Sequence, residues 1–303
     1  MKNTKKSVSM NHVAILITVF NRLDKTIKCL DALFASLANV PEVLADIYVT
    51  DDGSTDSTSS ALRERYAGKS LFLLQGDGKL FWNGGMNHSW RAALKHGGYD
   101  GYLWLNNDTV VFTNLWRELR EADAYAYRHF GKRGVYIGST CNAEGKLTYG
   151  GFDFVNRWTL KDKFLIPDGK NFQSCQCGHG NVTYISHEVT EVIGVLCDDY
   201  HHGGGDHDYT YLAYKKGFPV FILREFVGQC ENDHKEDGFY DFVRMGLKER
   251  IRYLNSPLGY NLHNTLLFQK RCFPYRYPMV WIAGYARALF PKMYMRVYRT
   301  LRK

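Results

Sequence analysis

The chain lacks any acidic residue after Glu249. Residues 250–303 contain 11 Lys or Arg and no Asp or Glu. The whole chain has a net charge of +8, so subtracting those 11 charges leaves −3 for residues 1–249. A mildly acidic body joined to a strongly basic segment points to an anionic partner, either a membrane leaflet or a nucleic acid.

Long apolar runs are also missing. No stretch of 18 apolar residues occurs, so the sequence predicts no membrane-spanning helix. The apolar run Val13–Phe20 follows three lysines, as in a signal peptide, but it ends in Asn21-Arg22 rather than in small residues. We therefore interpret it as a first β-strand and expect no secretory signal.

Cysteine is too irregular to form a disulfide framework. The chain has seven cysteines, an odd number without regular spacing, which predicts a reducing compartment such as the cytoplasm. The segment Cys175-Gln176-Cys177-Gly178-His179 has metal-like spacing, but no second pair follows at the distance of a zinc finger. We expect no zinc site there.

The length of 303 residues fits one large α/β domain with an appendage, or two small domains. Apolar runs alternate with segments of helical spacing, which predicts a mostly parallel sheet flanked by helices. The expected strands are 12–20, 45–50, 70–74, 102–105, 135–139, 182–186 and 217–223. The expected helices are 23–37, 57–66, 114–130, 206–216, 244–254 and one that runs from Asn87 or Ser89 to Lys95. Between them, 141–180 is expected to form loops and short strands, with 147–154 as one strand.

The stretch Tyr102–Asp108 is the most informative. Tyr102–Leu105 is predicted to be a strand buried on both faces, and Asn106, Asn107 and Asp108 follow at its carboxyl end. Open α/β sheets bind ligands at that end. Asp108 could hold Mg²⁺ or Mn²⁺ against a diphosphate, since these ions often use one or two carboxylates plus phosphates. The alternative is a capped turn after a core strand.

Two further turns carry small and polar residues. Asp51-Asp52-Gly53-Ser54 ends the second expected strand, and its carboxylates could accept hydrogen bonds from a base or ribose, while Gly53 permits a tight turn. A plain strand-to-helix loop is the alternative. The glycine-rich segment Gly76–Asn87 contains Phe81 and Trp82, which favours a shaped loop over a ligand.

The segment His201–Tyr209 places Asp206 and Asp208 at the start of a helix. Helix N–H groups favour an ionised acid, so Asp206 is a candidate general base, and a capping role is compatible with that chemistry. The histidines around it have no regular metal-ligand spacing. His234 is a candidate metal or phosphate contact, or a solvated loop histidine. After Glu249, aromatic and basic residues alternate between prolines, which favours helices in a membrane interface over a dimer interface or nucleic-acid binding.

Five motifs, in order and at family spacing, resemble family 2 glycosyltransferases of the GT-A fold, especially the bacterial rhamnosyltransferase-like branch. The resemblance covers about residues 12–235. The matching segments are Thr18–Arg22, Asp51–Asp56 as the nucleoside-binding motif, Gly76–Asn87, Asn106–Asp108 at the D-x-D position and Gly205–Asp208 at the [ED]-D-x-D position. Two departures are Asn106 and Gly205, which stand where the family has acids.

The resemblance implies a Rossmann-like nucleotide-binding half (1–112), an acceptor half (113–240) and a basic aromatic helical tail (241–303). It implies an inverting transfer with Asp206 as the base, a cation at Asp108 and at most a minor metal role for His234. His207 and Asp208 would lie on the acceptor side. The implied donor-binding residues are Thr18, Phe20, Asn21, Arg22, Asp51, Asp52, Gly53, Trp82, Gly84, Gly85, Asn87, Asn106 and Asn107.

The same resemblance implies partners and a cellular setting. The cofactor would be Mn²⁺ or Mg²⁺, the donor a dTDP-, UDP- or GDP-sugar, and the acceptor a glycan or lipid-linked saccharide of bacterial surface polysaccharide synthesis. The tail would place the enzyme at the inner face of the cytoplasmic membrane, with no nucleic-acid partner, and a homodimer stays open. Because Asn106 replaces an acid, a non-catalytic nucleotide-sugar-binding or scaffold protein on the same fold is the alternative.

Overall fold

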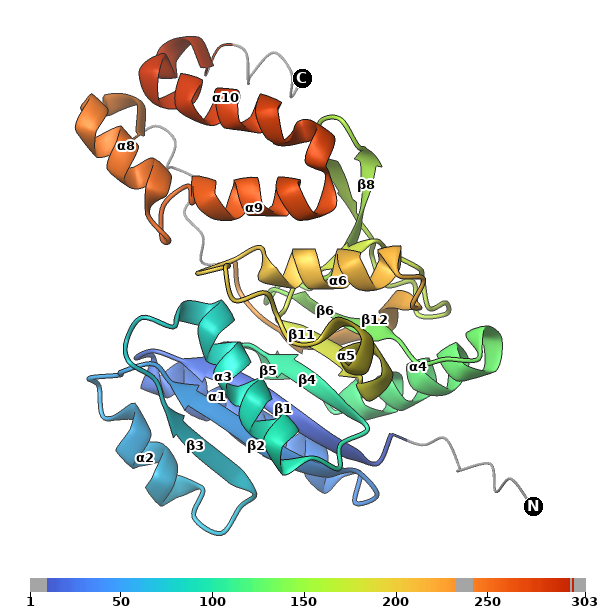
Figure 1. The fold of residues 1–303 in the computed structure, drawn as a ribbon. Coiled ribbons are helices and arrows are strands. Elements are labelled where there is room, and N and C mark those ends of the chain that lie inside the picture. Colours follow the sequence, from blue (N-terminus) through green and yellow to red (C-terminus); the bar gives the residue numbers. More distant parts are fainter. Residues whose placement is uncertain (1–9, 233–241, 295, 297–303) are drawn as a thin grey trace. The chain divides into compact units, whose positions relative to one another are not determined.

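The computed structural model describes residues 10–232, 242–294 and 296 (Figure 1). They form two compact units. The first comprises the described residues of Met1–Asp198 and Gly205–Asn232, and the second those of Asp199–Gly204 and Asp233–Lys303.

A nine-stranded sheet forms the centre of the first unit, in the order β3-β2-β1-β4-β11-β6-β12-β5, with β7 paired to β6. Its strands are β1 (His12–Val19), β2 (Leu44–Asp51), β3 (Leu71–Gln75), β4 (Gly101–Leu105), β5 (Val110–Val111), β6 (Val135–Cys141), β7 (Leu147–Tyr149), β11 (Val182–Ser186) and β12 (Val220–Gln229). The first four neighbours, β3, β2, β1 and β4, are parallel. Strand β11 runs antiparallel to both β4 and β6.

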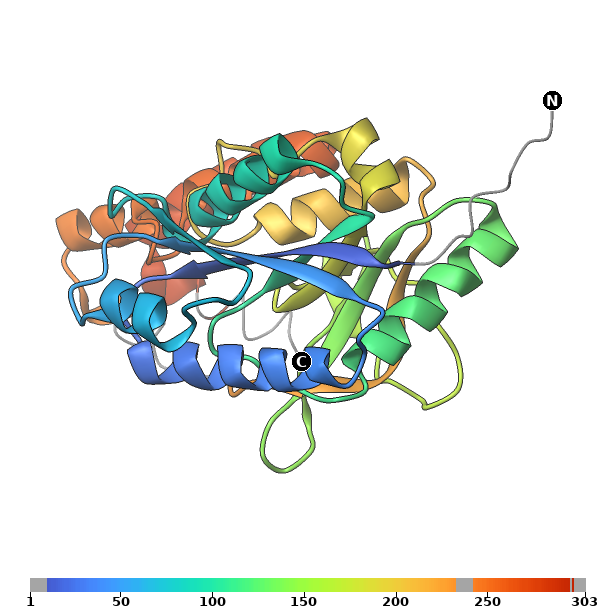
Figure 2. The ribbon, with the colours of Figure 1, turned by 90° about the horizontal axis from the view of Figure 1, so that it is seen from below.

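Helices cover both faces of this sheet (Figure 2). One face carries α1 (Leu23–Ala38), α2 (Thr58–Arg65) and α4 (Leu115–Phe130), and the other carries α3 (Phe81–His96), α5 (His187–Ile193) and α6 (Gly205–Lys215). All five residues of β4 are buried, as expected for a central strand covered on both sides. The predicted α/β architecture, with helices on both faces of a central sheet and a helical C-terminal extension, is confirmed.

A small second sheet has the order β10-β8-β9, and its first strand follows β7 in the chain. It consists of β8 (Gly151–Asn156), β9 (Lys161–Phe164) and β10 (Cys177–Gly178). The prediction of one strand over 147–154 is wrong, because the chain leaves one sheet and enters the other at Gly150. This glycine lies against β6, where a Cβ atom would be 2.7 Å from the Ser139 hydroxyl.

The predicted start of the third helix is also wrong. Helix α3 begins at Phe81, so Gly84, Gly85 and Asn87 are helical rather than part of a loop. The two glycines lower the helix propensity of the segment, but close packing overrides it. A Cβ atom on Gly85 would lie 2.3 Å from Thr18 Cγ2, so only glycine lets α3 approach β1 this closely.

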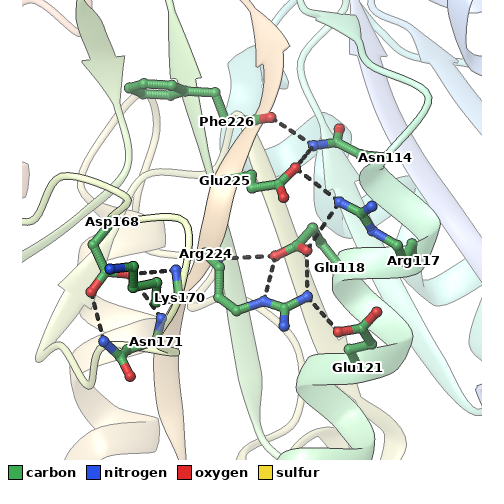
Figure 3. A network of polar contacts seen from close by, with 10 residues as sticks. All are labelled: Asn114, Arg117, Glu118, Glu121, Asp168, Lys170, Asn171, Arg224, Glu225 and Phe226. Atoms are coloured by element: carbon green, nitrogen blue, oxygen red, sulfur yellow. Dashed lines mark hydrogen bonds and ion pairs between the residues drawn. The ribbon is translucent and has the colours of Figure 1, made fainter.

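Strand β12 (Val220–Gln229) begins later than the predicted strand 217–223 and extends six residues beyond its predicted end. Its register shifts between Ile222 and Phe226. Figure 3 shows how polar side chains secure this irregular stretch to α4. The buried Glu118 carboxylate accepts from the Arg224 backbone N–H (3.0 Å), Nε (3.3 Å) and Nη2 (2.6 Å). Nearby, Glu225 accepts from Asn114 (2.8 Å).

The second unit is helical, with α8 (Leu247–Asn255), α9 (Leu262–Cys272), the 3₁₀ turn η1 (Pro274–Arg276) and α10 (Tyr277–Leu289). Leu254, Leu262 and Ala288 form its small core. Several large apolar side chains of α10 stay exposed: Tyr277, Met279, Trp281, Ile282, Tyr285 and Leu289. Among the described residues, no helix has both the length and the apolar character to span a bilayer.

Candidate active site

The carboxyl edge of the parallel strands gathers the predicted motifs. Since β1, β2 and β4 are parallel, the segments after Val19, Asp51 and Leu105 emerge at one edge of the sheet. The antiparallel β11 begins at this same edge, where Val182 pairs with Leu105. The segment before β11 therefore arrives there too, and the Asn106 N–H donates to the carbonyl of Asn181 (3.0 Å).

The two carboxylates after β2 shape their own surroundings. Asp52 accepts from the backbone N–H groups of Gly78 (2.8 Å) and Phe81 (2.9 Å), which fixes the approach to α3. Asp51 accepts from the Ser54 N–H (2.9 Å) and from the Ser59 hydroxyl. Both carboxylates are buried. In this structure they position the turn at Gly53, and their contact with a nucleoside stays a prediction.

Backbone strain accumulates at this edge. Asn21 (φ 56°), Arg22 (φ 62°) and Phe81 (φ 53°) adopt the left-handed region, which costs a non-glycine residue about 1–3 kcal/mol. Side-chain contacts hold the first of them, because Asn21 Oδ1 accepts from the Thr55 N–H (2.9 Å) and its own N–H donates to Ser54 Oγ (2.7 Å). Strain of this kind is typical of ligand sites.

The three residues after β4 each have a distinct partner. Asn106 Oδ1 accepts from the Trp82 indole N–H (2.7 Å), and Asn107 Nδ2 donates to Thr26 Oγ1 (2.9 Å). Asp108 forms an ion pair with Arg22 (3.1 Å), and its side chain is 19% exposed. The Cys230 thiol lies 3.7 Å from the other Asp108 oxygen. Asp108 is thus the carboxylate of this segment that a ligand can reach.

The side chains around Asp108 can bind a cation only if a substrate supplies further ligands. Within the parts of the chain that the structure describes, no three His, Cys, Asp or Glu side chains are grouped to hold a metal ion. The Asn106 oxygen is already bonded to Trp82, which leaves one carboxylate. Mg²⁺ or Mn²⁺ can bind through one carboxylate when phosphates and water supply the remaining ligands. The second candidate ligand, His234, lies outside the described residues.

Asp206 lies in the first turn of α6. Its Oδ2 accepts from the Gly180 N–H (2.9 Å), its Oδ1 accepts from the His207 N–H (2.9 Å), and its side chain is 14% exposed. Gly180 connects it to the first half of the sheet, because a Cβ atom there would lie 2.4 Å from the Trp82 ring and 3.4 Å from Asp206 Cβ. The same Trp82 holds Asn106. Asp206 and the segment after β4 therefore lie near each other, joined through Gly180 and Trp82.

Burial and neighbouring charges act on Asp206 in opposite directions. Burial favours the neutral form of Asp206. The charged forms of His207 (3.9 Å away) and His179 oppose burial, as do the hydrogen bonds from the Gly180 and His207 N–H groups. Together they outweigh burial, so the pKa of Asp206 lies below its usual value. Burial, followed by repulsion from His207, lowers the pKa of His179 to about 4. At neutral pH, Asp206 is therefore an ionised carboxylate beside a neutral His179.

The other predicted site residues differ in their exposure to solvent. Phe20 is exposed, whereas Asn87 is fully buried and donates to the Leu196 carbonyl (2.8 Å) and to Asp198 (2.9 Å). Asp208 is buried in α6. Sequence reasoning missed Gly180 and Cys230. The signal for Gly180 is its place just before a predicted strand, between His179 and Asn181.

Comparison with known protein families gives a match shorter than the predicted resemblance over about residues 12–235. Residues 14–140 match the model of glycosyl transferase family 2. These residues form a family 2 glycosyltransferase domain. The domain contains the motifs from Thr18 to Asp108, and Asp206 lies in the chain beyond it. No protein of curated function matches the chain in sequence.

Solved structures resemble the whole chain at low identity. The mannosyltransferase PcManGT from Pyrobaculum calidifontis, in complex with GDP-Man and Mn²⁺, is 15% identical with a TM-score of 0.54, over 95% of this chain and 79% of that one. TarS 1–349 from S. aureus, in complex with UDP, is 13% identical with a TM-score of 0.57, over 96% and 91%. These likenesses show that the family 2 glycosyltransferase domain has the GT-A fold.

Proposed function

We propose that this family 2 glycosyltransferase is an inverting enzyme that transfers a hexosyl or deoxyhexosyl group to a hydroxyl of a glycan or lipid-linked saccharide. Its donor is a dTDP-, UDP- or GDP-sugar. Residues 1–112 form the donor-binding half and residues 113–240 the acceptor half. The observation that supports this most is the meeting of Asp206 with the Asn106–Asp108 segment, through Gly180 and Trp82.

The chemistry assigns a separate task to each side of the site. Asp206 removes the proton from the acceptor hydroxyl as that oxygen attacks the anomeric carbon, and the bond from that carbon to the diphosphate breaks. Arg22, whose side chain is 54% exposed, binds the departing nucleoside diphosphate. Asp108 would hold a divalent cation, which would supply positive charge against the departing diphosphate.

Replacing the base tests this proposal. Asp206→Asn keeps the shape of the side chain and removes its basicity, so transfer falls by about 10²-fold or more while nucleotide-sugar binding is retained. Donor consumption reports the reaction, and a thermal shift with dTDP-, UDP- and GDP-sugars reports binding. Asp31→Asn, at an exposed ion pair on α1, is the matched control and keeps wild-type turnover. Wild-type turnover in Asp206→Asn would remove Asp206 as the base.

One observation favours a second candidate. Asn106 replaces a carboxylate and uses its oxygen for Trp82, which suits a nucleotide-sugar-binding or scaffold protein without catalysis. Release of sugar from the donor in the presence of Mn²⁺, and its loss after chelation with EDTA, identifies the enzyme. Donor binding without sugar release under both conditions identifies the scaffold.

The second unit supports a location of the enzyme at a membrane surface. The basic charge of 250–303 and the exposed apolar residues of α10 suit an anionic membrane surface, with a homodimer as the alternative. We place the protein at the inner face of the cytoplasmic membrane of a bacterium, where it acts in surface polysaccharide synthesis. This setting follows from the resemblance to the rhamnosyltransferase-like branch.

A further inference from the structure

The small β10-β8-β9 sheet turns one face toward the start of α6. Directly opposed residues of neighbouring strands lie on the same face, and Phe152 pairs with Phe164 while Phe154 pairs with Asp162. These four side chains therefore share a face. Phe152 makes an edge contact with the ring of His207 (5.0 Å between centroids), the residue after Asp206.

His179 connects this face to the proposed base. Its ring lies 4.9 Å from that of His207 and stacks on Phe164, with centroids 5.5 Å apart and ring planes 9° apart. Nδ1 of His179 bonds to the Gly150 carbonyl (2.9 Å), which fixes the orientation of the ring. A short series of ring contacts thus leads from Phe164 to the neighbour of Asp206.

The outer strand β9 leaves this face accessible. Phe164 remains 37% exposed although it contacts Phe152 and His179. Asp162, two residues earlier and hence on the same side of the strand, is an exposed carboxylate that acts electrostatically on His179. An open aromatic ring beside a carboxylate is a combination that suits a saccharide, because the ring covers apolar C–H groups while the carboxylate accepts from hydroxyls.

We propose that Phe164 and Asp162 form a subsite for the acceptor saccharide, in which the Phe164 ring stacks on a pyranose and Asp162 binds its hydroxyls. The proposal rests on the proposed function, since it takes Asp206 as the group that faces the acceptor. In this proposal, β9 binds the acceptor sugar that lies next to the reacting hydroxyl. The donor motifs lie instead on the loops after β1, β2 and β4.

Saturation-transfer NMR tests this subsite on the full chain without requiring turnover. The probes are the methyl pyranosides of glucose, galactose, mannose and rhamnose, whose methyl aglycone cannot itself stack on an aromatic ring. We expect at least one to bind through its ring C–H protons. Phe164→Ala weakens that binding about tenfold, a loss of the size expected for one aromatic stack. Asp162→Asn weakens it as well, and UDP or GDP binding does not change in either variant.

A matched control is available on the main sheet. Phe72 on β3 is 39% exposed and also stacks on one ring, that of Tyr48 (4.8 Å, 15°), so Phe72→Ala removes an equivalent aromatic side chain elsewhere. Phe72→Ala keeps wild-type glycoside binding. Equal binding in Phe164→Ala and wild type, or a wild type that binds none of the four glycosides, overturns the subsite. A wild-type protein that binds glycosides as expected but transfers no sugar would instead count against the proposed function alone.

Discussion

Asp206 shows how the charge of one residue depends on its neighbours. Because its pKa lies below the usual carboxyl value, the ionised form is present throughout the neutral range. A carboxyl whose pKa is lowered in the folded state stabilises the fold at pH values above its unfolded-state pKa. This stabilisation is lost as the pH falls through its folded-state pKa. Asp206 therefore stabilises the fold in the same pH range in which the proposed mechanism uses it as a base.

A pH profile tests this coupling. We expect the acid limb of kcat/KM that belongs to Asp206 to lie at lower pH than the usual carboxyl pKa, because the pKa of Asp206 is lowered. His207→Gln removes a positive neighbour, so the limb moves to higher pH. His187→Gln is the matched control, since His187 follows β11 at the opposite end of the sheet and leaves the profile unchanged. An acid limb that stays in place or moves down in His207→Gln would contradict the electrostatic account.

At the scale of elements, α3 depends on one close approach. Gly85→Ala puts a methyl group 2.3 Å from Thr18 Cγ2, and the resulting shift of helix and strand costs about 1–3 kcal/mol of unfolding free energy. Gly84→Ala, one residue earlier, meets its nearest atom at 3.2 Å, so it changes stability by less than about 1 kcal/mol. Chemical denaturation of both variants measures the difference. Equal stability of the two would show that the contact with Thr18 is not tight.

The contact between α4 and β12 makes a second prediction (Figure 3). Glu118→Ala leaves the Arg224 backbone N–H without its acceptor and removes a fully buried partner of the guanidinium, at a cost of about 3 kcal/mol. Glu121, the exposed second partner of Arg224, is the control, and Glu121→Ala costs at most about 1 kcal/mol. Denaturation midpoints compare them. A similar loss in both would show that the buried carboxylate contributes no more than the exposed one.

These elements also show what the sequence could predict. Strands β1 and β4 are continuous apolar runs, so their burial follows from composition, and the parallel order then brings the turns after them together. The start of α3 could not be predicted, because its glycines indicate a loop unless Thr18 is known to lie against Gly85. The length of β12 could not be predicted either, because Glu118, the partner of Arg224, lies 106 residues away in the chain.

For the whole molecule, the unequal distribution of charge is the main consideration. We expect the full chain to bind liposomes that contain phosphatidylglycerol and to release them as salt rises, because screening weakens the attraction of the basic tail. Ile282→Asp puts a charge on the exposed face of α10 and weakens this binding. Val192→Asp, at a similarly exposed apolar residue of α5, has no effect. Equal binding to neutral liposomes at all salt concentrations would contradict the prediction.

The pairing of β5 with β12 has a consequence for building hybrid enzymes. Val111 lies in the segment that we propose binds the donor, yet it pairs with Gly228, more than a hundred residues later. A recombinant that joins residues 1–112 of this chain to the remainder of a distant relative would set β5 beside a foreign strand. Exchange of sugar-donor preference between relatives therefore calls for two crossovers, with the second placed so that β12 travels with its partner.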